Sequence, residues 1–281
     1  MLEKWQIRKL IEAAFYEDIP FCDITSEFLI SDNAVGRAYF LAKKDLIVCG
    51  KPVVEEVFNF IDPEIKIDWQ VKEGEEVKAY TKLGFVEGLI KSILKAERIA
   101  LNFFQHLSGI ATYTRVIVKK IEPYHTTLLD TRKTLPGWKM LQKYAVKVGG
   151  GQNHRFSLSD GILIKDNHIK ALGGIKEVFN RLKKLPHYLK VEIEVKSLEE
   201  LEIILKSKAP IDIVLLDNFS LEDIKKAISL IKKYKSNIKT EVSGGITLEN
   251  VENYAKLGID YISSGALTHS VKAVDISLKL E

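Results

Sequence analysis

The chain is poor in cysteine and has no apolar run long enough to cross a bilayer. Cys22 and Cys49 are the only cysteines in 281 residues. They form no C-x-x-C pair, which argues against a sulfur-rich metal site and predicts free thiols in a reducing compartment. No stretch approaches the roughly 20 apolar residues that a transmembrane helix needs. Because the first residues resemble an ordinary amphipathic helix rather than a signal peptide, we expect a cytoplasmic protein without a membrane partner.

The chain also lacks two sequence features that are typical of nucleotide-binding and nucleic-acid-binding proteins. No G-x-G-x-x-G motif follows a first strand, so a dinucleotide-binding fold has little support. Aromatic residues are few in the basic stretch at residues 130–170, where Trp138, Tyr144 and Phe156 are the only ones. Base stacking on single-stranded nucleic acid needs aromatics interleaved with basic side chains. We therefore expect no nucleic-acid partner.

Positive charge, by contrast, is concentrated in one stretch. Residues 130–170 hold eight Lys or Arg against three acids, whereas the whole chain has a net charge of only +4. Concentrated like charge repels itself and usually faces an anion. Glycine, proline and short apolar runs interrupt the stretch, which argues against a disordered basic tail. The pattern predicts several loops that converge on one anionic ligand.

The first part of the chain, residues 1–109, mixes helices, strands and turns without strict alternation. This mixture favours a layered α/β domain, with the C-terminal segment at about 270–281 as a candidate addition. Period-2 patterns predict three strands, at 36–42, 46–49 and 65–71. Helical patterns occur at 51–60 and 91–107.

From residue 110 to 269, short apolar strands alternate with helices. The expected strands are 127–129, 161–164, 191–195, 213–216, 240–242 and 261–263. The expected helices are 137–148, 174–184, 198–208, 221–234 and 248–257. Such alternation implies parallel strands with right-handed crossovers. It predicts a closed or nearly closed α/β barrel, with a doubly wound open sheet as the main alternative.

Basic residues follow the first two of these strands. Arg132 and Lys133 come directly after one strand, and Lys165 ends the next, with His168 three residues later. Because the active site of an α/β barrel lies at the carboxyl ends of its strands, these side chains are expected to meet. Arginine grips a carboxylate with two parallel hydrogen bonds, whereas lysine acts as a point charge. His168 is either a ligand-binding or a purely structural histidine.

The pair His154 and Arg155 follows a triple glycine at 149–151. The glycines either let the backbone approach a ligand closely or only end a helix. Like Arg132 and Lys133, His154 and Arg155 are therefore candidates for the anion site.

Two glutamates alternate with apolar residues in the strand 191–195. Glu192 and Glu194 share one face, and if the apolar face packs on the helices both carboxylates point into the barrel. There they need a partner, either a nearby lysine in a structural ion pair or a metal. Asp217 ends the next strand, and two carboxylates together with substrate phosphate suit Mg²⁺.

Small residues end the last two strands, each before a helix. The two segments are Ser243-Gly244-Gly245 and Ser264-Gly265. Free backbone N–H groups and the helix dipole favour phosphate at such places, and barrels often bind phosphate after their final strands.

Together these motifs resemble the quinolinate phosphoribosyltransferase family over nearly the full length. The resemblance includes ERIALN at 97–102, is strongest in DTRKTLPG, KYAVKVGGGQNHR and ILIKDNHI, and ends in EVSGGITLENV and YISSGALTHS. It implies an N-terminal α/β sandwich and a C-terminal open α/β barrel. It also implies Mg²⁺-dependent transfer of phosphoribosyl from 5-phosphoribosyl 1-pyrophosphate to quinolinate, which yields nicotinate mononucleotide, pyrophosphate and CO₂ in NAD biosynthesis.

The resemblance, read with the strand-end pattern, also implies residue roles. Quinolinate binding falls to Arg98, Arg132, His154, Arg155 and Lys165. Phosphoribosyl pyrophosphate binding falls to Lys133, Ser243, Gly244, Gly245, Ser264 and Gly265. The implied catalytic residues are Lys133, Lys165, Glu194 and Asp217, the last two also holding Mg²⁺. The implied assembly is a homodimer or larger homo-oligomer in which Arg98 reaches a neighbouring subunit's site.

The chain departs mildly from the family pattern, for example at Ser157, where glycine is common. Two alternatives stay open. One is a molybdate-transport-associated relative of the family, and the other is a barrel that binds phosphosugars without catalysis.

Overall fold

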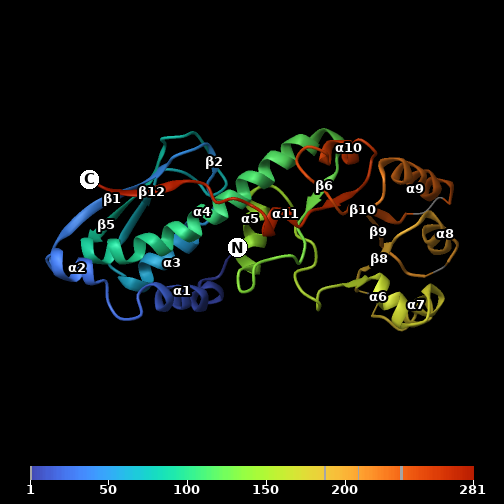
Figure 1. Cartoon of the computed structure of the whole chain (residues 1–281), viewed down its shortest axis with the longest axis horizontal. Coiled ribbons are helices and arrows are strands. Elements are labelled where there is room, and N and C mark those ends of the chain that lie inside the picture. Colours follow the sequence, from blue (N-terminus) through green and yellow to red (C-terminus); the bar gives the residue numbers. More distant parts are fainter. Residues whose placement is uncertain (1, 187, 208, 235–236) are drawn as a thin grey trace. The chain divides into compact units, whose positions relative to one another are not determined.

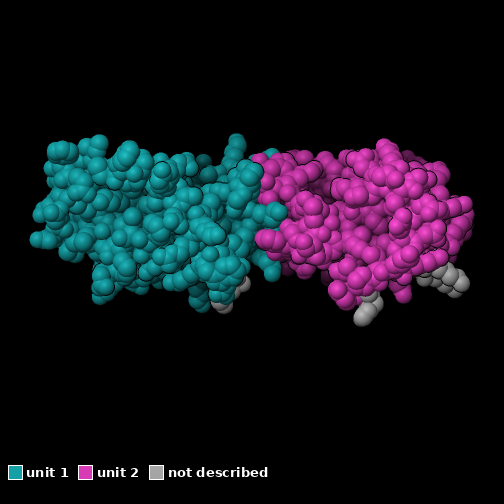
Figure 2. Space-filling model, turned by 90° about the horizontal axis from the view of Figure 1, so that it is seen from below, with its two compact units in different colours: residues 1–115, 135–150, 270–281 teal, residues 116–134, 151–269 magenta. Residues whose placement is uncertain are grey.

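The computed structural model describes residues 2–186, 188–207, 209–234 and 237–281. The chain forms two compact units, shown in different colours in Figure 2. Unit 1 contains residues 1–115, 135–150 and 270–281, and unit 2 contains residues 116–134 and 151–269. Residues 135–150, which the sequence analysis placed with the second half of the chain, therefore cluster with the first.

Unit 1 is built on a four-stranded antiparallel sheet with the order β12-β1-β5-β3 (Figure 1). Its strands are β1 (Val35–Ala42), β3 (Lys66–Trp69), β5 (Lys82–Leu89) and β12 (Ile276–Leu280). Two short strands, β2 (Leu46–Ile47) and β4 (Glu76–Val77), form a separate antiparallel pair. The helices are α1 (Lys4–Asp18), α2 (Ile24–Leu29), α3 (Lys51–Ile61), α4 (Ile90–Ile121) and α5 (Lys139–Val148).

The core of unit 1 follows from the alternation in β1. Ala38, Phe40 and Ala42 are fully buried on one face of the strand. The ring of Phe40 stacks on Trp69 and meets the edge of Phe104, which brings the sheet and α4 together. Buried aromatic pairs of this kind dominate the energetics of a core.

Two residues of the triple glycine, Gly149 and Gly150, shape the end of α5 where it packs on α4. Gly149 ends α5, and a Cβ atom there would lie 2.6 Å from the carbonyl oxygen of Ala111. Gly150 has a φ of 99°, a conformation that side chains rarely adopt. Of the two explanations for this motif, the structure favours the helix end.

Unit 2 is a parallel six-stranded sheet with the order β6-β11-β10-β9-β8-β7. Its strands are β6 (Thr127–Leu129), β7 (Ile162–Ile164), β8 (Val191–Val195), β9 (Ile213–Asp217), β10 (Lys239–Ser243) and β11 (Tyr261–Ser263). Strands β7 to β11 follow one another in chain order, as in a barrel, whereas a doubly wound sheet reverses its order part-way. Because β6 and β7 stand at opposite edges, the sheet is not closed. The predicted open α/β barrel is confirmed.

Helices surround the outer face of this sheet (Figure 1). They are α6 (Asp166–Ala171), α7 (Ile175–Leu182), α8 (Leu198–Lys206), α9 (Leu221–Lys233), α10 (Val251–Ala255) and α11 (Ala266–His269), preceded by a 3₁₀ turn at Glu122–Tyr124. The predicted end of one helix at Lys208 falls outside the described residues. Within the described ranges, no helix is both long and apolar enough to cross a membrane.

The alternation in the strands of unit 2 sorts their side chains between two environments. Ile193, Val195 and Val214 are fully buried on the helix side. Glu194 and Leu215 point the other way and line a pocket inside the barrel. The predicted inward direction of the β8 carboxylates is thus observed.

Candidate active site

A pocket of about 300 Å³ opens inside the barrel, lined mainly by residues at and after the carboxyl ends of the strands of unit 2. It brings together eight of the predicted site residues, which are Arg132, Lys133, His154, Arg155, Lys165, Glu194, Asp217 and Ser243. The other lining residues are Thr131, Leu163, Leu215, Glu241 and Ser263, none of which was predicted as a site residue.

Two guanidinium groups, those of Arg132 and Arg155, face this pocket and repel each other. Burial lowers the pKa of Arg155, and the nearby charge of Arg132 lowers it further. Nη1 of Arg155 donates to the carbonyl of Gly161 at 3.0 Å, while its buried Nε has no hydrogen-bond partner among the described residues. Because like charges held together are relieved by a counter-ion, this part of the pocket suits an anion.

Lys165 crosses from β7 to the neighbouring strand. Its Nζ lies 3.1 Å from Oε2 of Glu194, whose side chain is only 7% exposed. The structural ion pair considered for this glutamate is therefore present. The Lys165 side chain is itself 49% exposed, so its ammonium group remains accessible from the pocket.

Asp217 presents a carboxylate to the same pocket from β9. Its carboxylate makes no hydrogen bond or ion pair within the described part of the chain. The pKa of nearby Lys196 is raised mainly by its hydrogen bond to Asp166, with smaller contributions from the charges of Glu194 and Asp217. Two carboxylates on adjacent strands, one of them without a direct partner, form an oxygen donor set of the type that binds hydrated Mg²⁺.

His154 is held on both sides of its ring. The main-chain N–H of Arg155 donates to Nδ1 at 2.7 Å, and Nε2 lies 2.8 Å from Oε2 of Glu192. A backbone N–H is always a donor, so Nδ1 carries no proton and Nε2–H donates to Glu192.

His154, Glu192 and Glu241 lie close enough together to resemble a metal site. A ligating Nε2, however, needs its lone pair free, which in neutral imidazole moves the proton to Nδ1. That position already accepts the Arg155 N–H. The geometry therefore favours a hydrogen-bonded trio over a metal centre here.

Glu241 is the most unusual acid of the pocket. Its side chain is 1% exposed, and burial together with the charge of Glu192 raises its pKa to about 7. His154 and a hydrogen bond from Ser263 act in the opposite direction. The sequence of β10, KTEVS, lacks the alternation of apolar and acidic residues that identified Glu192 and Glu194 in β8.

Of the two segments predicted to bind phosphate, only the first contributes a residue to the pocket lining. Ser243 lines the pocket, whereas Gly244, Gly245, Ser264 and Gly265 do not. A Cβ atom at Gly265 would lie 2.8 Å from Cδ of Lys133, so this glycine makes room for the Lys133 side chain. Ser264 is buried and donates weakly to the carbonyl of Ile246 at 3.4 Å.

Two further candidates lie elsewhere. Nδ1 of His168 accepts the main-chain N–H of Lys165 at 2.9 Å, which gives this histidine a structural role at the start of α6. Arg98 lies on α4 in unit 1 and is exposed. The pocket described above is made of unit 2 residues alone.

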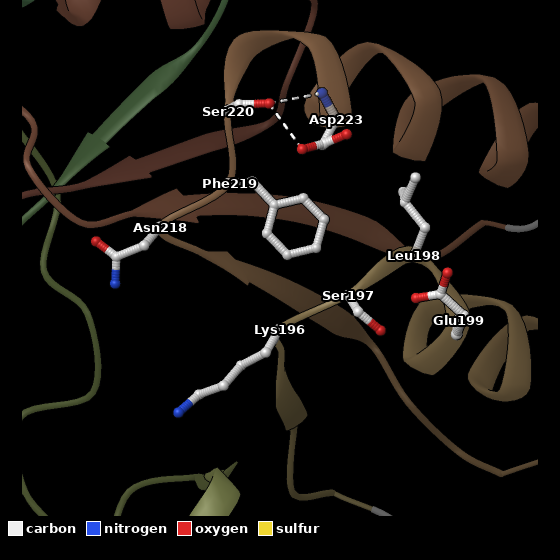
Figure 3. Close-up of a pocket in the computed structure, with 8 residues that line it drawn as sticks. All are labelled: Lys196, Ser197, Leu198, Glu199, Asn218, Phe219, Ser220 and Asp223. Atoms are coloured by element: carbon white, nitrogen blue, oxygen red, sulfur yellow. Dashed lines mark hydrogen bonds between the residues drawn. The ribbon is translucent and has the colours of Figure 1, made fainter.

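A second hollow lies beside the first, between the amino ends of α8 and α9 (Figure 3). The N-cap residues Ser197 and Ser220 accept backbone N–H groups of their own helices. Glu199 and Asp223 stand in the first turns, and Ser220 also donates to Asp223 at 2.7 Å. The helix ends are thus already compensated by acids, which disfavours phosphate there.

Comparison with known proteins identifies the family. The model of the quinolinate phosphoribosyl transferase C-terminal domain matches residues 110–279, and that of the N-terminal domain matches residues 23–108. The chain belongs to the quinolinate phosphoribosyltransferase family. The predicted family is confirmed.

Similar proteins of this family extend over almost the whole chain. A probable nicotinate-nucleotide pyrophosphorylase (carboxylating) of Methanocaldococcus jannaschii is 44% identical over 97% of this chain and 96% of its own length. A chloroplastic enzyme of the same name from Arabidopsis thaliana is 40% identical over 99% of this chain and 83% of its own length. The solved structure of the nicotinate-nucleotide pyrophosphorylase of Francisella tularensis has a TM-score of 0.94 at 41% identity, covering 100% of this chain and 98% of that one.

Proposed function

We propose that this chain transfers the phosphoribosyl group of 5-phosphoribosyl 1-pyrophosphate to quinolinate and releases pyrophosphate and CO₂, forming nicotinate mononucleotide. The names of its relatives support this reaction. The observation that carries it is the pocket of unit 2, which brings four Lys and Arg side chains together with Glu194 and Asp217 on adjacent strands and with the buried Glu241. This charge pattern matches two anionic substrates and one divalent cation. A barrel that only bound phosphosugars would not need the complete set.

The cationic side of the pocket is the proposed quinolinate site. Arg132, Arg155 and Lys165 supply three positive charges for two adjacent carboxylates, and the repulsion between the two guanidinium groups favours a dianion over a monoanion. Holding the substrate by its carboxylates orients the ring nitrogen toward the anomeric carbon of the sugar. Such positioning replaces an encounter in solution by a fixed approach.

The acidic side is the proposed site of the pyrophosphate and its Mg²⁺. Glu194 and Asp217 fit a hydrated Mg²⁺ because both oxygen donors open on the pocket and Asp217 has no direct protein partner among the described residues. When bound, the cation stabilises the charge that develops on the leaving pyrophosphate. Lys133, which packs over Gly265, adds a second positive charge beside the same phosphates.

We further propose a homo-oligomer with shared sites. Arg98 is exposed on α4, and apart from the charge of Glu97 no partner of its guanidinium is found among the described residues. On one side of it, a groove of about 210 Å³ in unit 1 is lined in part by Ile99, Asn102 and Trp138. A cation without a partner on such a surface is suited to the anion site of a second copy.

Apolar exposure on unit 1 supports the same assembly. Phe21 is 96% exposed and Phe28 is 84% exposed. Tyr16, Ile24 and Leu29 are exposed in the same part of the chain. Large exposed apolar side chains near one another in the chain favour a protein partner, and a second copy of this chain is the proposed partner.

The location of the protein stays a prediction. We propose a cytoplasmic enzyme, although plant relatives carry names that place them in chloroplasts or mitochondria.

The direct test is turnover. The purified chain, supplied with quinolinate, 5-phosphoribosyl 1-pyrophosphate and Mg²⁺, is expected to release CO₂ and form nicotinate mononucleotide in equal amounts. Omission of Mg²⁺ with a chelator is the control. Absence of product from folded protein under these conditions would contradict the proposal.

A further inference from the structure

Both ring nitrogens of His154 are occupied by groups of the protein itself. Nδ1 accepts the Arg155 main-chain N–H at 2.7 Å, and Nε2–H donates to Glu192 at 2.8 Å. A neutral imidazole has a single N–H. None remains for a carboxylate of the substrate, so His154 contributes to the site in some other way.

Behind the imidazole stand two buried carboxylates that the proposed mechanism does not use. Glu192 on β8 is 6% exposed and Glu241 on β10 is 1% exposed at the side chain, and Oε2 of Glu241 lies 3.7 Å from Nε2 of His154. One oxygen of each, Oε1 of Glu192 and Oε2 of Glu241, has no hydrogen-bond partner among the described residues. Buried carboxylates left partly unsatisfied are costly, which indicates that they serve the site.

In front of the imidazole, the chain from Asn153 to Arg155 is fixed at several points. The main-chain N–H of His154 donates to Oδ1 of Asp130 at 2.9 Å, and Asp130 is fully buried at the end of β6. The imidazole then fixes the next N–H, that of Arg155. The guanidinium that reaches the pocket therefore starts from a backbone whose direction is set by His154.

We propose that Glu192, backed by Glu241, is a positioning residue of the quinolinate site. Glu192 holds the His154 ring, His154 orients the main chain of Arg155, and Arg155 meets the substrate carboxylate. His154 accordingly acts through Arg155 and donates no hydrogen bond to quinolinate. This inference rests on the proposed function for the identity of the ligand.

Two substitutions at Glu192 distinguish the effect of its hydrogen bond to His154 from the effect of its side-chain volume. Glu192→Gln keeps an oxygen that accepts from Nε2 and adds an amide that can donate to Glu241. Glu192→Leu has similar bulk but no acceptor. We expect Glu192→Leu to raise the KM for quinolinate about tenfold, the loss expected for one hydrogen bond, with the KM for 5-phosphoribosyl 1-pyrophosphate and kcat within about threefold of the parent. Glu192→Gln should lose much less.

The matched control is Ile193→Val on the same strand. Ile193 is fully buried on the opposite face of the strand. The substitution removes one methylene group from the core and changes no group that contacts His154. It should leave both KM values unchanged. An unchanged quinolinate KM in Glu192→Leu, or an equal rise in the control, would overturn the proposal.

His154→Gln decides the question independently if Glu192→Leu does not fold. Glutamine keeps a donor near the position of Nε2 but has no acceptor near Nδ1 for the Arg155 N–H. Positioning predicts a rise in the quinolinate KM as large as in Glu192→Leu. Direct donation to the substrate predicts that His154→Gln binds quinolinate nearly as well as the parent, and that result would overturn the proposal.

The tautomer provides a spectroscopic test that a purely structural role would not explain. In ¹⁵N-histidine-labelled protein, with His154→Gln used for assignment, Nδ1 should carry no proton and Nε2 should carry one, before and after quinolinate is added. A proton on Nδ1 in the complex would overturn the inference. Failure of turnover in the parent chain would instead contradict the proposed function. The tautomer measured in that case would still test whether His154 orients Arg155.

Discussion

Replacing Glu241 by glutamine should stabilise the protein at neutral pH. Burial and the charge of Glu192 raise the pKa of this carboxyl from 4.5 to about 7 in the folded state. In the unfolded chain the proton is released near pH 4.5. Between these values the unfolded state holds fewer protons than the folded state, so the stability of the parent falls as the pH rises and levels off above about 7.

The magnitude follows from the width of this interval. Each pKa unit corresponds to about 1.4 kcal/mol, so Glu241 should remove roughly 3 kcal/mol of stability from the parent between pH 4.5 and pH 8. Glutamine does not titrate, and its amide can donate to Oε1 of Glu192, which has no hydrogen-bond partner among the described residues. The free energy of unfolding of Glu241→Gln minus that of the parent should therefore grow by roughly 3 kcal/mol over this range.

Urea unfolding at pH 4.5, 6 and 8 measures this difference, with protein concentration held fixed because an oligomer gains stability by mass action. Glu252→Gln is the control. The Glu252 carboxylate lies 2.7 Å from Lys256, and this lysine lowers its pKa below 4.5, so its contribution to stability changes mainly below that pH. The stability of the control relative to the parent should therefore stay nearly constant from pH 4.5 to pH 8. A difference between Glu241→Gln and the parent that is the same at pH 4.5 and pH 8 would refute the reasoning.

Four other outcomes follow from the proposed site. Quinolinate should be used far better than nicotinate, because a single carboxylate leaves part of the cation cluster unpaired, and comparable kcat/KM values for the two acids would contradict this. Asp217→Asn should weaken the use of 5-phosphoribosyl 1-pyrophosphate much more than quinolinate binding, measured across a Mg²⁺ titration, and unchanged turnover would remove Asp217 from the site. Gly265→Ala should displace the Lys133 side chain and raise the KM for 5-phosphoribosyl 1-pyrophosphate with little effect on that for quinolinate, whereas equal KM values in parent and variant would argue against this packing. Arg98→Ala and Lys165→Ala chains should each be nearly inactive, yet after random reassociation as dimers they should recover roughly a quarter of the parent activity, and no recovery despite verified subunit exchange would place both residues in one subunit's site.

The strands of unit 2 could be predicted because their signal is local. Thr127–Leu129, Val191–Val195 and Tyr261–Ser263 have the expected bounds, since a short apolar run between turn residues identifies a buried strand without reference to its neighbours. Strand β5 was not predicted, because Gly84 and Gly88 interrupt its alternation. Helix α6 is only six residues long, too short for its periodicity to be recognised.

The site was predictable where charge follows a strand. Arg132, Lys165 and Asp217 stand at or just after strand ends, and the parallel order of the strands brings such positions to one end of a barrel. Glu241 was not assigned because its neighbours, Thr240 and Val242, mark it only as a charged residue in a strand. Its raised pKa depends on the burial and on Glu192, which comes from a strand about fifty residues earlier in the chain.

The sequence by itself determined the alternation of strands and helices, the inward direction of the β8 glutamates and the family of the protein, because these are written in local periodicity and in contiguous motifs. Only the tertiary structure decided that Gly149 and Gly150 shape the end of α5 where it packs on α4, that Gly265 makes room for Lys133, and that both nitrogens of His154 are occupied. Each of these depends on two segments far apart in the chain approaching within a few ångströms. A close approach of that kind, and the hydrogen bonds and proton positions that it sets, has no signature in either segment alone.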